Sequence, residues 1–171
     1  MKKVKIVLDA DIIIHFSKGQ MLSILPNIFP KYKYIILDKV YEEIVGSIKK
    51  QLDNQISLLK NITLIEFKPY GEEMREYAFL LQNFGKGETA SMIYCKWNHD
   101  VLASSNLKDI KTYCNKNQIT YLTTFDFLYY AVKNKLISQK EACDFINEVL
   151  SKGSKLPSVE NYKVFVSRVE I

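Results

Sequence analysis

The chain has 171 residues, 47% hydrophobic and 25% charged, a balance that suits one globular domain with its own core. Its net charge of +5 favours an anionic partner, but the basic residues are scattered and few are arginines, so sequence-independent phosphate contacts are expected rather than base reading. The 3 cysteines have no zinc-type spacing and no apolar run approaches membrane-spanning length, so we expect a cytoplasmic protein without a membrane partner.

Strands and helices alternate along the chain, because runs of β-favouring residues give way repeatedly to apolar residues at helical spacing. The first strand ends on Asp9, and Asp38 is a good N-cap for a helix with Val40, Ile44 and Ile48 on one face. In chain order we predict strands at 4–8, 34–37, 62–67, 100–104 and 119–122, and helices at 11–19, 38–48, 74–84, 85–97, 108–116, 125–136 and 138–153.

This alternation predicts the α/β class, as a three-layer α/β/α sandwich with a mostly parallel central sheet. We expect residues 1–150 to form one domain. Residues 151–171 are expected to be a C-terminal extension packed on that domain, in which residues 162–169 could add an edge strand.

Acidic and amide side chains occur near the ends of several predicted strands. In a parallel sheet the carboxyl ends of the strands point the same way, so such side chains can surround one crevice. Carboxylates brought that close repel one another, or raise one another's pKa, unless a cation neutralises them. Hard oxygen ligands suit one or two Mg²⁺ or Mn²⁺ ions and phosphodiester hydrolysis. The set comprises Asp9, Glu42, Glu43, Glu88, Asn106 and Asp109.

Four short segments resemble, in the same order, the acidic motifs of PIN-domain nucleases. They are VLDADIII at 7–14, VYEEI at 40–44, GKGETAS at 85–91 and LASSNLKDI at 102–110. The resemblance, which runs from about residue 4 to 130, implies a PIN-like fold with Asp9, Glu43 and Glu88 as catalytic metal ligands. Asn106 or Asp109 would complete the ligand set. Periodicity does not separate Glu42 from Glu43, and only the resemblance favours Glu43.

As a PIN-like protein, the chain would be a metal-dependent ribonuclease that hydrolyses single-stranded or structured RNA with Mg²⁺ or Mn²⁺. PIN proteins of this size are often toxins of toxin–antitoxin pairs, which implies an antitoxin protein as a partner and a homodimer. One departure is Asn106, which stands where an aspartate would add charge, so a second metal ion would be held less strongly. Asp109 or Asp126 could supply the missing carboxylate.

Other interpretations stay open. Asp9 and Asp11 could be the nucleophile pair of a haloacid-dehalogenase-like phosphatase, although Ile13 stands where that family has threonine or valine. A PIN-like scaffold with a degenerate metal site could instead act as a protein or nucleic-acid binding module, an interpretation that Asn106 supports. Asp11 suits an N-cap better than a ligand, and His15 suits a packed or hydrogen-bonded position.

Overall fold

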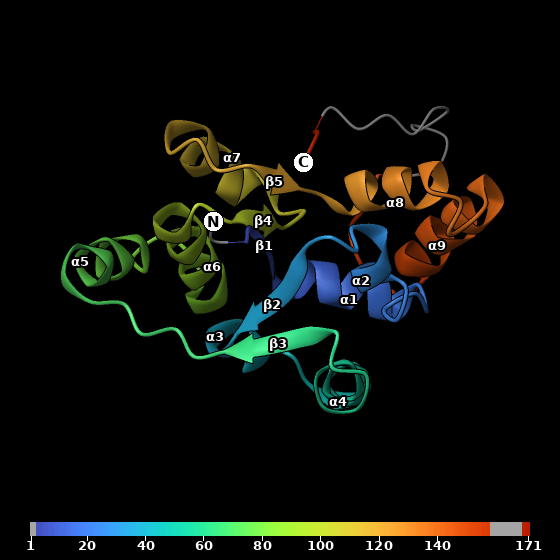
Figure 1. Ribbon diagram of the computed structural model, residues 1–171, viewed down its shortest axis with the longest axis horizontal. Helices are drawn as coiled ribbons and strands as arrows, with labels where there is room; N and C mark the ends of the chain where they lie inside the picture. The colour runs from blue at the N-terminus through green and yellow to red at the C-terminus, as the bar shows by residue number, and fades with distance from the viewer. Residues whose placement is uncertain (1–2, 158–168) are drawn as a thin grey trace.

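The computed structural model describes residues 3–157 and 169–171, and its centre is a parallel sheet in the strand order β3-β2-β1-β4-β5 (Figure 1). The strands are β1 (Lys5–Leu8), β2 (Lys33–Leu37), β3 (Ile62–Ile65), β4 (Val101–Ala103) and β5 (Tyr121–Leu122). All four neighbouring pairs are parallel. The predicted α/β class and parallel sheet are therefore confirmed.

Helices cover both faces of the sheet. They are α1 (Ala10–Lys18), α2 (Leu25–Ile28), α3 (Asp38–Tyr41), α4 (Gly46–Asp53), the π-helix η1 (Asn54–Leu58), α5 (Gly71–Leu80), α6 (Lys86–Asn98), α7 (Leu107–Lys116), α8 (Thr124–Lys133) and α9 (Gln139–Ser151). Helix α6 packs against α3, α5 and α7 on one side, whereas α1, α2, α8 and α9 form the layer on the other (Figure 1). The result is the predicted three-layer sandwich.

Strand β1 occupies the middle of the sheet, and its register with β4 sets where the carboxyl ends of these two strands lie. Val7 lies between Ile35 of β2 and Leu102 of β4, and it is fully buried, as is typical of a strand covered on both faces. Leu8 is in register with Ala103, and the Asp9 N–H donates to the Ala103 carbonyl over 2.9 Å. The carboxyl ends of β1 and β4 therefore lie side by side.

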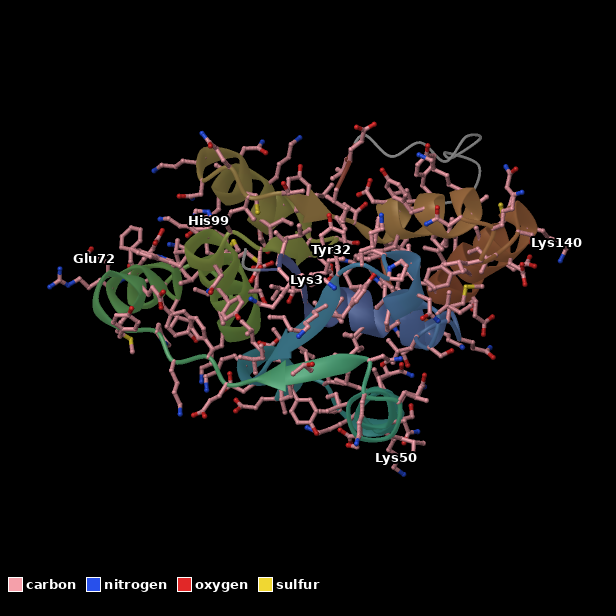
Figure 2. The ribbon with its side chains drawn as sticks, viewed as in Figure 1. Lys3, Tyr32, Lys50, Glu72, His99 and Lys140 are labelled. Carbon is pink, nitrogen blue, oxygen red and sulfur yellow. The ribbon has the colours of Figure 1, made fainter. Side chains whose placement is uncertain are left out.

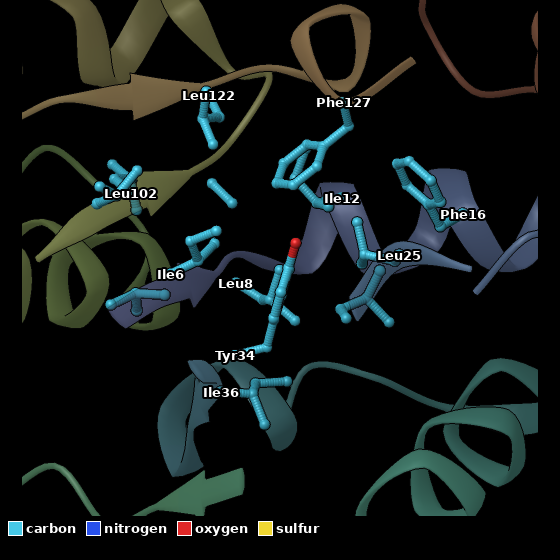
Figure 3. Packing of buried hydrophobic residues seen from close by; sticks show 14 of the residues in the cluster. Ile6, Leu8, Ile12, Phe16, Leu25, Tyr34, Ile36, Leu102, Leu122 and Phe127 are labelled. Atoms are coloured by element: carbon cyan, nitrogen blue, oxygen red, sulfur yellow. The ribbon is translucent and has the colours of Figure 1, made fainter. Parts of the chain in front are cut away.

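The apolar core between the sheet and its helices fixes the orientation of α1 (Figure 3). Phe16 of α1 packs edge-on against Phe127 of α8, with ring centroids 5.9 Å apart. Tyr34 of β2 is buried in the same core, and its hydroxyl accepts a hydrogen bond from the Phe29 N–H over 3.2 Å. Burial raises the pKa of Tyr34, so this hydroxyl stays protonated. Charged side chains such as Lys50, Glu72 and Lys140 lie instead at separate places on the outside (Figure 2).

Two local predictions differ from the structure. The helix expected over 38–48 is broken: α3 ends at Tyr41, Val45 is extended, and α4 begins at Gly46 with a φ of +63°. Such a left-handed backbone conformation interrupts a helix and is accessible to glycine at little cost. The first helix begins at Ala10, and its N-cap is Asp9, whose carboxylate accepts the Ala10 N–H; Asp11 lies in the first turn. The strand suggested for 162–169 lies almost entirely outside the described residues.

Candidate functional site

Acidic side chains from separate segments meet near the carboxyl ends of the central strands. Asp9 follows β1 directly and is only 5% exposed. Glu43 follows α3, and because α3 packs on α6, its Oε1 accepts a hydrogen bond of 2.8 Å from the Gly87 N–H in the first turn of α6. A Cβ atom added to Gly87 would lie 2.8 Å from that oxygen, so the close approach requires glycine.

Asn106 joins the acidic residues of α6 to those of α7. Its Nδ2 donates to Glu88 Oε1 over 2.8 Å and to Asp109 Oδ2 over 2.7 Å. A carboxylate at residue 106 would repel both of these neighbours, whereas the amide group donates a hydrogen bond to each. The asparagine therefore lowers the negative charge of the cluster and holds two of its carboxylates in place.

The pKa shifts show that these carboxyl groups interact. Burial raises the pKa of Asp9, and the nearby Glu43 charge adds to the rise, whereas the Ala10 N–H and the Ser104 hydroxyl oppose it. Burial also raises the pKa of Glu88 to about 7, with further contributions from Asp9, Asp109 and Glu43. Four segments distant in sequence thus share one region of negative charge.

Asp11 belongs to the same region, although sequence analysis gave it mainly a capping role. Its Oδ2 accepts the Ser105 N–H over 2.7 Å, while Oδ1 is buried with no hydrogen-bond partner among the described residues. Burial and the neighbouring Asp9 raise the pKa of Asp11. The signal in the sequence was the spacing of two aspartates at a helix start, which places both at the same strand end.

A chain of buried and part-buried hydrogen bonds supports the loop after β4. The Ser105 hydroxyl accepts the Thr124 N–H and lies 2.8 Å from Thr124 Oγ1, which in turn lies 2.8 Å from His15 Nδ1. Burial, with a smaller effect of Lys18, lowers the pKa of His15 to about 4, so the ring is neutral near pH 7. The predicted packed, hydrogen-bonded role of His15 is confirmed, and the positioning contacts of Ser105 and Thr124 were missed.

Two other candidate acidic residues make different contacts. Glu42 is largely exposed, and its carboxylate lies 4.0 Å from Lys39 Nζ. Asp126 completes the capping box of α8, whose N-cap is Thr123, since its Oδ2 accepts hydrogen bonds from the Thr123 N–H and hydroxyl over 2.8 and 2.6 Å. Of the neighbouring pair, Glu43 and not Glu42 makes the contact with α6.

The donor chemistry of the cluster suits a hard divalent cation, which carboxylate and amide oxygens bind. Burial first, and then the charges of neighbouring carboxylates, raise the pKa values of Asp9, Asp11 and Glu88, so ionising these groups together is costly unless a cation is present. Asp11 Oδ1 has no hydrogen-bond partner among the described residues and is free to face such a cation. Within residues 3–157 and 169–171, however, no three histidine, cysteine, aspartate or glutamate side chains stand in a metal-holding arrangement. The carboxylates accept protein hydrogen bonds instead.

A comparison with protein families matches residues 5–170 to a family described as a PIN domain, which extends past the segments that carry the sequence resemblance. No curated protein and no solved structure gives a significant match. Among the described residues, no helix combines the length and apolar character needed to cross a membrane.

Proposed function

Because the chain belongs to the PIN-domain family, which has a nuclease-type fold, we propose that it is a metal-dependent nuclease that hydrolyses the phosphodiester bonds of RNA. The observation that supports this proposal is the gathering of Asp9, Glu43, Glu88 and Asp109 beside the carboxyl ends of the central strands, where Gly87 holds Glu43 and Asn106 joins Glu88 to Asp109. In open parallel sheets this edge is where ligands bind.

In this proposal Asp9, Glu43 and Glu88 hold Mg²⁺ or Mn²⁺, with Asn106 or Asp109 completing the ligand set. When bound by these residues, a divalent ion would provide activation of water and stabilisation of negative charge. The protein contributes the positions of the ligands: Gly87 orients Glu43 through its N–H, and Asn106 orients Glu88 and Asp109 through its amide. Ser105 holds Asp11 beside them.

The substrate and partners are further parts of the proposal. A net charge of +5 supports a polyanionic substrate such as RNA, with lysines as the main phosphate contacts. We also propose that the protein is a cytoplasmic toxin held inactive by an antitoxin protein, and that it forms a homodimer. Its expression in a bacterial host should then arrest growth, and the Asp9→Asn variant should not.

The direct test is RNA cleavage by the purified protein with and without added Mg²⁺ or Mn²⁺. Cleavage should require the ion and vanish in Asp9→Asn, because a neutral amide replaces the most buried ligand. Glu43→Gln should likewise lose cleavage, whereas Glu42→Gln is the matched control and should retain it. Equal cleavage by wild type and Asp9→Asn would point to a contaminating nuclease, and the absence of ion-dependent cleavage by wild-type protein freed of it would refute the proposal.

A second candidate function is a PIN-like scaffold that binds protein or nucleic acid without catalysis. It is favoured by the neutral Asn106 and by the absence of a preassembled three-ligand group among the described residues. Calorimetric titration with Mn²⁺ separates the two functions, since a nuclease must bind the ion. Lack of heat and lack of cleavage together would exclude the nuclease and favour the scaffold.

A further inference from the structure

A cavity of about 480 Å³ lies at the β5 end of the sheet, within the usual size range of small-ligand pockets. Its walls come from the start of α7, from β5 and from the start of α8, and the C-terminal part of the chain contributes residues 155–157 and 169. The lining residues include Tyr121, Phe125, Leu107, Leu156, Lys155 and Ser105.

This cavity adjoins the acidic site through Ser105 and Leu107. Ser105 lines it, and the N–H of the same residue holds the Asp11 carboxylate over 2.7 Å. Leu107, which is 41% exposed, follows Asn106 directly in the chain, and Asn106 contacts Glu88. A ligand seated in the cavity would therefore border the acidic cluster.

The walls combine flat apolar surfaces with a cation and one carboxylate, that of Asp126, which accepts hydrogen bonds from the Thr123 N–H and hydroxyl. Tyr121 and Phe125 are both partly exposed aromatic residues, and the exposed Lys155 lies on the same cavity. Aromatic faces stack on nucleobases of any sequence, and lysine binds the adjoining phosphate as a point charge. A base must leave its helical stack to enter such a cavity, which favours single strands over a duplex.

We propose that this cavity binds one nucleobase of a single-stranded RNA, next to the phosphate that lies over the acidic cluster. The inference rests on the proposed function, since it takes RNA as the substrate of that site. Tyr121 supplies the stacking surface and Lys155 contacts the backbone of the same strand. Loss of one stacked base typically weakens binding by about 5-fold to 150-fold.

The test uses a single-stranded oligoribonucleotide that contains 2-aminopurine, whose fluorescence is quenched by stacking, and the Asp9→Asn variant to prevent cleavage. Binding should quench the fluorescence. Adding Tyr121→Leu should abolish the quench and weaken affinity about tenfold. Tyr70→Leu is the matched control, because Tyr70 is 80% exposed and lies outside the cavity, and it should change neither quantity.

Lys155→Gln is a second variant that changes an exposed side chain and therefore leaves folding intact. It should weaken binding and reduce the salt dependence of the affinity. Equal affinity for a duplex, or binding with no quench, would overturn the inference.

The outcome also separates this inference from the proposed function. Cleavage by the wild-type protein without a quench leaves the nuclease proposal standing and removes the base pocket. A Tyr121-dependent quench in a protein that never cleaves RNA would support the base-binding cavity and remove the nuclease proposal.

Discussion

Gly87→Ala should reduce nuclease activity strongly while leaving the fold almost as stable as before. The new methyl group would lie 2.8 Å from Glu43 Oε1 and 3.0 Å from the carboxyl carbon, so the carboxylate has to move. That movement is easy for the fold, because Glu43 is exposed and its carboxylate is the far end of a flexible side chain.

The expected change in stability is a difference of small effects. Replacing a helical glycine by alanine stabilises by about 0.5–1 kcal/mol, and losing the hydrogen bond from the Gly87 N–H costs about 0.5–1.5 kcal/mol. The free energy of unfolding should therefore stay within about 1 kcal/mol of wild type. Metal affinity or activity should fall about 10-fold to 100-fold, the usual effect of losing a group that orients a ligand.

The assay measures urea unfolding and Mn²⁺-dependent RNA cleavage on the same preparations. Gly85→Ala is the matched control, because no described atom lies within 4 Å of a Cβ added there and Gly85 is the N-cap of the same helix. It should lose about 0.5–1 kcal/mol of stability and keep its activity, the reverse of Gly87→Ala. Full activity in Gly87→Ala would refute the role of the Glu43–Gly87 contact.

Three other outcomes are expected. The pKa of Glu88 rises on folding from 4.5 to about 7, so the folded state holds the proton more tightly, and the contribution of Glu88 to stability is lost as pH rises through about 7. Mg²⁺ should therefore raise Tm more at pH 8 than at pH 5, and equal rises would contradict this. Thr124→Val removes the hydroxyl between His15 and Ser105 and should lower the free energy of unfolding, measured in urea, by about 1–3 kcal/mol. Thr124→Ser keeps the hydroxyl and should restore most of that loss. Equal losses in both variants would rule out the hydroxyl as the cause. Glu76→Gln weakens hydrogen bonds that Glu76 accepts from two side chains of α6 and one of α7. It should lower the free energy of unfolding by about 1–2 kcal/mol without slowing cleavage. Reduced cleavage at full stability would disprove a purely structural role of Glu76.

Local sequence signals predicted most elements of the fold well. The capping box of Ser138 and Glu141 marked the start of α9, and the β-favouring run at 34–37 marked β2. Such signals act within a few residues of the chain and need no knowledge of packing. The break after Tyr41 was missed because the apolar spacing of Val40, Ile44 and Ile48 continues across it.

The sequence by itself determined the order of the five strands and of the longer helices, although not the short α2 and η1 or the separation of α3 from α4. It also determined the placement of Asp9 at the end of β1 and that of Glu88 in the first turn of α6. Only the tertiary structure decided that Glu43, rather than Glu42, approaches Gly87, and that Asn106 joins Glu88 to Asp109. The physical reason is the distance along the chain over which each interaction acts. Backbone periodicity and capping are set by neighbours along the chain, whereas these contacts exist only after α3 and α7 pack against α6.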